Sequence, residues 1–405
     1  MIKVKKREID YILLGLLIIS LYLGNLNINV GISIKPYMIV MCIIFIYISK
    51  EFYFRKLYKY ELMMLLFFIT FSLTSLRLTY PEKHIRYILA LIVILAFYFI
   101  IKCFLDRFTI KELQECFVYY SNIAIILSLL YYVIGIISVR GNFKANNVHK
   151  YGMLLDRGIP RLTGLVSTDP NIFVFFLTII FFYTLNNFNS RRNKLGLFLS
   201  ALVIILTFSR GAYLAIGFTI IIMFLLEKNV KYKIKLIINS ILVFISFIFI
   251  GKYFSIDVVA TIIDRFNSIS TDGGSGRTVL WGNAITSFKD NPIFGIGINS
   301  TTSYGIEKYG NPHYVHNSIL EILSEGGIFV FLFFMLFIIA VFCSCIKLHK
   351  LNNNNKYLII TLIALLIQMI FLSIIYNEMF YFFLLILQRY LYEYDKNKNS
   401  SYLSS

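Results

Sequence analysis

Two histidines in the last quarter of the chain are the first candidates for chemistry. His313 and His316 follow Asn311 and Pro312, a pair typical of a helix start, so the spacing predicts both imidazoles within the first two turns of a helix. The positive end of a helix dipole disfavours imidazolium, and a neutral histidine there can act as a general base. A plain anchoring role at a membrane surface is the alternative for each histidine. The adjoining Asn317 makes His316 the preferred base.

Three arginines beside apolar stretches form the second candidate set. Arg210 stands between two apolar runs, whereas Arg161 and Arg277 stand in polar segments next to other runs. The planar guanidinium fork matches two oxygens of a phosphate group, and lysine has no such fork. Arginine at these places therefore favours a phosphate-bearing ligand. Snorkelling to lipid headgroups is the alternative for Arg210.

Two other polar clusters have simpler interpretations. A cationic cluster before the fourth apolar run favours contact with lipid headgroups, although one member, Arg86, is kept as a candidate for substrate binding. The members of this cluster are Arg77, Lys83, His84 and Arg86. Asp169 followed by Pro170 indicates the N-cap of a helix.

The elements that must position these residues are membrane-spanning helices. Hydrophobic residues make up 58% of the 405 residues and charged residues 15%, which excludes an ordinary soluble enzyme, a disordered chain and a secreted disulfide scaffold. The predicted fold class is therefore all-α, a polytopic integral membrane protein with about 12 transmembrane helices. The apolar runs lie at residues 11–28, 34–49, 62–79, 87–105, 117–137, 171–185, 196–208, 212–226, 236–254, 319–346, 357–375 and 378–390.

The formal net charge of +18 is explained by the orientation of these spans. Short loops rich in Lys and Arg alternate with less basic ones, which places both termini in the cytoplasm. We expect one membrane domain, 1–405, with a long helical extracytoplasmic loop at 255–318 between the ninth and tenth spans and a cytoplasmic tail at 391–405. Within the loop, the spacing of Leu280, Ala284 and Phe288 predicts an amphipathic helix over Thr278–Asp290.

Metal and cofactor chemistry is not expected from the motifs. The sequence contains no Cys-x-x-Cys pair, no nucleotide-binding loop and no paired-aspartate motif, and acidic residues are few in the outer segments. We therefore expect no metal ion and no cofactor. Because the positive charge follows the membrane topology, no nucleic-acid partner is expected either.

Four pieces of the sequence, taken in order, resemble the O-antigen polymerase and O-antigen ligase superfamily. The pieces are Ser209-Arg210-Gly211-Ala212, Gly276-Arg277 with Trp281, Asn291-Pro292 with Phe294-Gly295-Ile296-Gly297, and His316-Asn317 with Leu320. The sequence Arg161-x-x-Gly164 followed by Pro170-Asn171 is also similar to the family pattern. The resemblance covers about residues 161–330. Val330 stands where ligases have Gly, Thr or Tyr, which argues against the ligase more than against the superfamily.

The resemblance implies an integral membrane glycosyltransferase of the GT-C type, which takes a glycan from an undecaprenyl diphosphate carrier at the outer face of the inner membrane. It implies that His316 is catalytic and that Arg210 and Arg277 hold the diphosphate. Because the carrier bond supplies the energy, the reaction is expected to need neither metal nor nucleotide, and to invert the anomeric centre. The further candidates for substrate binding are Arg161, His313, Asn317, Trp281 and Arg86.

The preferred function is polymerisation of carrier-linked repeat units into a surface polysaccharide, such as an O-antigen, a capsule or an exopolysaccharide. Ligation of the glycan to lipid A core is the alternative within the same chemistry. A flippase for lipid-linked glycan is the alternative of another class, but it should carry charges at the midplane of its spans, whereas the notable charges here stand at the outer ends. Expected partners are the carrier-linked glycan, the bilayer, and a chain-length regulator and a flippase of the same pathway.

Overall fold

The protein is mostly helical in the computed structural model. The structure describes residues 2–403 except residues 25, 30–32, 55, 78, 141–142, 144–146, 166–168, 228 and most of 232–275. The described helices are α1 (Ile2–Tyr22), α2 (Pro36–Ile48), α3 (Lys59–Leu73), α4 (Pro81–Leu105), α5 (Ile110–Ser138), α6 (Pro170–Asn186), α7 (Arg191–Leu206), α8 (Arg210–Leu226), α11 (Arg277–Asp290), α12 (Thr301–Tyr309), α13 (Ser318–Leu351), α14 (Lys356–Met369) and α15 (Glu378–Leu403).

Within the described residues, four helical segments are long and apolar enough to cross a membrane. They are Lys59–Arg77, which continues α3 through a short 3-10 turn, and the helices α4, α5 and α13. The helices α6 and α8 are apolar but shorter. A multi-pass helical membrane protein is therefore supported, whereas the predicted number of about 12 spans is not confirmed. The predicted ninth span at 236–254, and the part of the loop before residue 276, lie largely outside the described residues.

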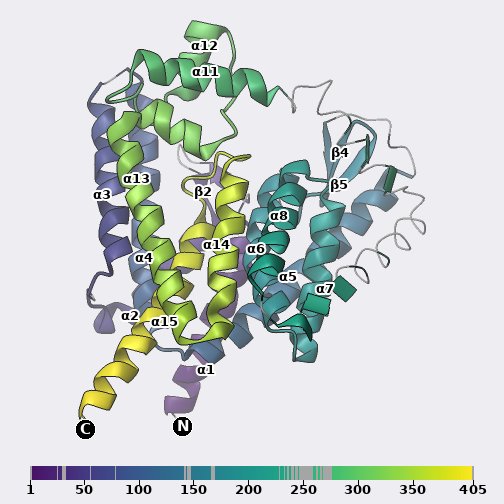
Figure 1. Ribbon diagram of the computed structural model, residues 1–405, viewed down its shortest axis with the longest axis vertical. Coiled ribbons are helices and arrows are strands. Elements are labelled where there is room, and N and C mark those ends of the chain that lie inside the picture. The colour runs from purple at the N-terminus through teal and green to yellow at the C-terminus, as the bar shows by residue number, and fades with distance from the viewer. Residues whose placement is uncertain are drawn as a thin grey trace.

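The long helices form a bundle with both termini at one end and α11 and α12 lying across the other (Figure 1). Helix α3 packs along α13, where the Phe67 ring lies 5.3 Å from the Phe334 ring. The predicted amphipathic helix is confirmed as α11, which buries Leu280 and Ala284. We call the end that carries α11 and α12 the α11 end.

A small antiparallel sheet between α5 and α6 departs from the all-α expectation. Its strands are β3 (Val148–Lys150), β4 (Met153–Asp156) and β5 (Ile159–Leu162), and β4 pairs with both neighbours. The turn between β4 and β5 consists of Arg157 and Gly158, both with positive φ, which matches the twist of a two-residue hairpin. A two-residue β1–β2 pair (Ile28–Asn29 and Ser33–Ile34) is the other described sheet.

Helix α13 is broken near its start, and the break holds the segment that follows α11. Gly327 has φ 70° and ψ −170°, so the helix is interrupted there. Backbone groups around the break bond to that segment: Ile296 N–H donates to Ser324 O at 2.9 Å, and Ile328 N–H donates to Pro292 O at 2.8 Å. Backbone groups that the break leaves without helical partners thus form hydrogen bonds with the backbone of residues 292–297.

Replacing Gly327 with alanine should sharply reduce the yield of folded protein. A Cβ at this residue would lie far inside van der Waals contact with Ile293 O, and the backbone conformation is one that costs a residue with a side chain about 1–3 kcal/mol. Size-exclusion chromatography and thermal unfolding of the purified variant measure the effect. The matched control is Gly282→Ala on α11, where a Cβ would meet nothing within 4 Å. A normal yield and melting temperature for Gly327→Ala would contradict this account of the break.

Candidate active site

The N-termini of α6 and α8 meet at the α11 end through Asn171 and Ser209. Ser209 caps α8 by accepting a hydrogen bond from Ala212 N–H at 3.3 Å, and its hydroxyl donates to the side-chain oxygen of Asn171. Asn171 belongs to the first turn of α6, whose predicted cap, Asp169, is confirmed because its carboxylate accepts from Asn171 N–H at 2.7 Å. Two helix N-termini therefore lie side by side, and the positive ends of their helix dipoles favour an anion nearby.

Arg161 connects the sheet to this junction. It belongs to β5 and is 9% exposed. Its Nε donates to Thr207 O at 3.0 Å, and its other nitrogens donate to Asp156 at 3.2 Å and to the Asn171 side chain at 3.3 Å. The structure thus shows Arg161 bound to protein oxygens beside the start of α8. Whether it also contacts substrate stays a prediction.

Arg277 is the first residue of α11 and is half-buried above the same junction. Burial lowers the pKa of its guanidinium, Asp169 raises it, and Arg210, the first residue of α8, lowers it. These effects mean that the Asp169 carboxylate and the Arg210 guanidinium both lie within electrostatic range of Arg277. Since like charges repel, placing two guanidinium groups together favours a ligand with at least two negative charges.

His316 lies in an irregular segment and not in a helix, so the predicted helix start at Asn311 and Pro312 is wrong. Asn311 instead forms a local turn, in which its side-chain oxygen accepts from His313 N–H at 3.1 Å. Helix α13 begins after Asn317, whose side chain accepts from the N–H groups of residues 319 and 320, both at 3.0 Å. Asn317 is thus the N-cap, and His316, with φ 51°, stands just before it.

The His316 imidazole joins the arginine cluster electrostatically. Burial is the largest effect lowering its pKa below the usual 6.5, and Arg277 and His313 lower it further, while Asp169 raises it. The lowered pKa favours the neutral imidazole, the form that a general base requires. Arg277 thus lies within electrostatic range of Arg210 and of His316, the other two residues predicted to be catalytic, and His313 is exposed near His316.

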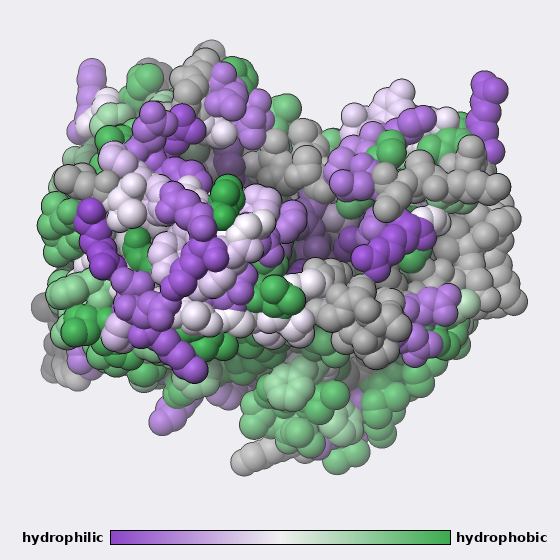
Figure 2. Space-filling model, turned by 90° about the horizontal axis from the view of Figure 1, so that it is seen from above, coloured by the Kyte–Doolittle hydropathy of each residue, from purple (hydrophilic) through white to green (hydrophobic). Residues whose placement is uncertain are grey.

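The floor of the site is the segment between α14 and α15, which the sequence reasoning missed. Ser318 fastens it to α13: Ser318 N–H and Oγ both donate to Leu372 O, at 2.9 and 2.6 Å, and Ser318 Oγ accepts from Ile374 N–H at 2.9 Å. The Phe371 ring lies 6.5 Å from that of Trp281 on α11, and a Cβ on Gly211 would lie 3.0 Å from Phe371. The segment therefore lies between Arg210, α11 and His316. Seen from this end, hydrophilic residues surround a central hollow (Figure 2).

Three members of the cationic cluster at residues 77–86 have protein partners in the structure, and headgroup contact stays a prediction. Arg77 donates to the Asn291 side chain at 3.1 Å and to Gly295 O. Lys83 Nζ donates to Thr302 Oγ1 at 2.9 Å, and buried His84 bridges Ser75 O and Ser300 Oγ. These side chains hold residues 291–302 against the start of α4 and the 3-10 turn before it. Arg86 is exposed, and within the described residues no contact joins it to the arginine cluster.

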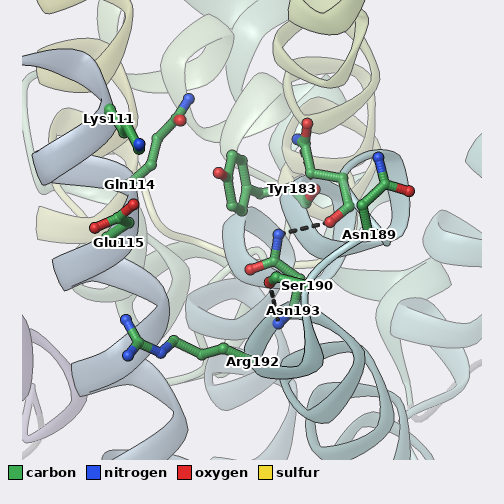
Figure 3. Close-up of a pocket in the computed structure, with 9 residues that line it drawn as sticks. Lys111, Gln114, Glu115, Tyr183, Asn189, Ser190, Arg192 and Asn193 are labelled. Carbon is green, nitrogen blue, oxygen red and sulfur yellow. Dashed lines mark hydrogen bonds between the residues drawn. The ribbon is translucent and has the colours of Figure 1, made fainter.

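A polar cavity of about 570 Å³ lies at the opposite end of the bundle, near the starts of α5 and α7 (Figure 3). Lys111 and Glu115 face Tyr183 and the amides of Asn189 and Asn193 across it. None of the predicted site residues lines this cavity. It is thus separate from the cluster at the α11 end.

The comparison with protein families bears on the chain as a whole and not on single residues of this cluster. Residues 195–335 match the O-antigen ligase family. The match confirms the resemblance to the O-antigen polymerase and ligase superfamily, and no curated protein matches the chain. The matched residues include Arg210, Arg277, Trp281 and His316, whereas Arg86 and Arg161 lie outside the match.

Proposed function

We propose that the protein is a membrane glycosyltransferase that polymerises undecaprenyl-diphosphate-linked repeat units into a surface polysaccharide. The observation that carries the proposal is that Arg277 lies within electrostatic range of both Arg210 and His316, beside the N-termini of α6 and α8. The proposed location is the inner membrane, with the α11 end facing outward. The family match supports the chemistry at the coarser level of the superfamily.

The proposed reaction is one displacement at the anomeric carbon. His316 accepts the proton of the attacking sugar hydroxyl while the new carbon–oxygen bond forms. The bond from the anomeric carbon to the carrier phosphate breaks, and its electron pair stays on the diphosphate oxygen. Arg210, Arg277 and the helix N-termini stabilise that growing charge. Attack from the side opposite the leaving group inverts the anomeric centre.

The test uses carrier-linked glycan extracted from cells that lack the protein. Purified protein in nanodiscs is incubated with this extract without nucleotide, and the products are separated by size. A ladder of long glycans supports the polymerase. Transfer only to added lipid A core supports the ligase, which the description of the matched family favours as the second candidate. Movement of the lipid across the bilayer with no new glycosidic bond would support a transporter and sink both enzymes.

Arg210→Lys should lower the rate of transfer about tenfold to a hundredfold. Lysine keeps the charge at the start of α8 but loses the fork that binds two phosphate oxygens at once. Initial rates at saturating glycan measure the effect. Arg192→Lys, at the opposite end of the bundle, is the matched control and should leave the rate unchanged. Equal rates for wild type and Arg210→Lys would mean that the guanidinium does not grip the diphosphate.

A further inference from the structure

The carboxyl group of Glu321 is buried in the first turn of α13 and is not used by the proposed mechanism. Glu321 is 2% exposed, and its Oε2 atom has no hydrogen-bond partner within the described residues. Leaving a buried polar group without a partner is energetically unfavourable, and more so if the group is charged. A native protein retains such a group where water or a ligand completes its bonds.

Two further polar atoms without partners lie beside Glu321. Ser373 lies close enough to interact with the carboxyl, yet its Oγ completes no hydrogen bond in the described part of the chain. The hydroxyl of Tyr376 also lacks a partner within the described residues, and it interacts electrostatically with Glu325 and, less strongly, with Glu321. Ser318 fixes this arrangement, because its bonds to residues 372 and 374 place Ser373 against the start of α13.

Aromatic rings lie next to Glu321, Ser373 and Tyr376. The Tyr87 ring of α4 lies 4.6 Å from the Tyr376 ring in an edge-to-face arrangement, and Tyr87 also feels the charge of Glu321. Tyr314, half-exposed, is near enough to interact with Tyr87. Carboxyl, hydroxyl and aromatic groups together can pair with the hydroxyls and pack on the apolar faces of a sugar.

The neighbouring Glu325 shows what a satisfied carboxylate looks like on the same helix face. It accepts from Asn299 N–H at 2.8 Å, Thr301 N–H at 3.1 Å and Thr301 Oγ1 at 2.9 Å, and so holds the start of α12. Glu325 therefore has a structural use that Glu321 lacks. Of these two carboxyl groups, Glu321 is therefore the one with hydrogen-bonding capacity left for a ligand.

We propose that Glu321, Ser373 and Tyr376 form a hydroxyl-binding subsite for the acceptor saccharide. The subsite adjoins His316 through Asn317 and Ser318, so a sugar held there presents a hydroxyl to the base, while the diphosphate of the donor lies with Arg210 and Arg277. The inference rests on the proposed function and deepens it. Glu321 is a positioning residue, since it orients the acceptor and His316 takes the proton.

The test compares Glu321→Gln, Ser373→Ala and Tyr376→Phe with wild type in two assays. The first is transfer with the extracted carrier-linked glycan, and the second is binding of undecaprenyl diphosphate without sugar. Glu321→Gln should lower transfer at least tenfold, and the other two variants threefold to tenfold, while the dissociation constant for undecaprenyl diphosphate changes less than twofold. The matched control is Glu307→Gln, an exposed carboxyl of α12, which should change neither.

Two results would overturn the subsite. Transfer by Glu321→Gln within twofold of wild type would remove its role, and an equal loss of transfer and of diphosphate binding would make that role merely structural. If Glu321→Gln does not fold, normal transfer by both Ser373→Ala and Tyr376→Phe overturns the proposal. A wild-type protein that makes no glycosidic bond would sink the proposed function itself, which separates the two failures.

Discussion

Alanine in place of Arg277 should lower the rate of glycan transfer by about a hundredfold to a thousandfold while the protein stays folded. Arg277 starts α11 and is half-buried near Arg210, so its charge acts in a medium less polar than water. Removing one preorganised donor from a site of developing negative charge typically costs this factor. Initial rates with extracted carrier-linked glycan, together with the dissociation constant for undecaprenyl diphosphate, measure the loss.

The same helix supplies the control for this prediction. Lys289 is an exposed cation near the end of α11, and Lys289→Ala should leave the rate within twofold of wild type. Arg277→Lys should fall between wild type and Arg277→Ala, because the charge stays and the fork is lost. Unchanged diphosphate binding in Arg277→Ala would show that the guanidinium does not contact the carrier.

Alanine in place of His316 should abolish glycan transfer almost completely. In the wild-type protein, the rate of transfer should fall only at acidic pH. The base must be neutral, and burial with the nearby Arg277 holds the pKa of His316 below 6.5. The neutral imidazole therefore persists from pH 7 down through pH 6.5, and the rate falls as the pH drops through the lowered pKa. A pH–rate profile of kcat/KM for the wild-type protein between pH 4.5 and 8 reports that pKa.

His313 separates this account from its nearest alternative. It is exposed and contributes to the lowered pKa of His316 only through its charge, so His313→Gln should keep most of the rate. Loss of transfer in His313→Gln with a normal rate in His316→Ala would assign the base to His313. A wild-type profile whose acid limb lies above pH 7 would contradict a lowered pKa for the base.

Several features of the protein could be predicted from the residues alone, because they depend on neighbours in the chain. The composition indicated helices in a membrane, because the share of apolar residues can be counted from the sequence without knowing any tertiary contact. The spacing of Leu280 and Ala284 predicted α11, and Asp169 with Pro170 predicted the start of α6. The resemblance to the O-antigen polymerase and ligase superfamily singled out Arg210, Arg277 and His316, and their guanidinium and imidazole groups suit a diphosphate and a proton.

Only the tertiary structure decided how these residues come together. Helix α13 begins after Asn317, because the Asn317 side chain accepts from two N–H groups of the first turn. The pair Asn311 and Pro312 has the same residue types as a helix start, and the sequence did not show which of the two asparagines caps the helix. The hydrogen bonds that build the site join residues 38 positions apart between Ser209 and Asn171, 46 between Arg161 and Thr207, and 54 between Ser318 and Leu372. Contacts over such separations depend on how the helices pack, which no local pattern encodes, so the floor of the site and the subsite around Glu321 were visible only in the folded chain.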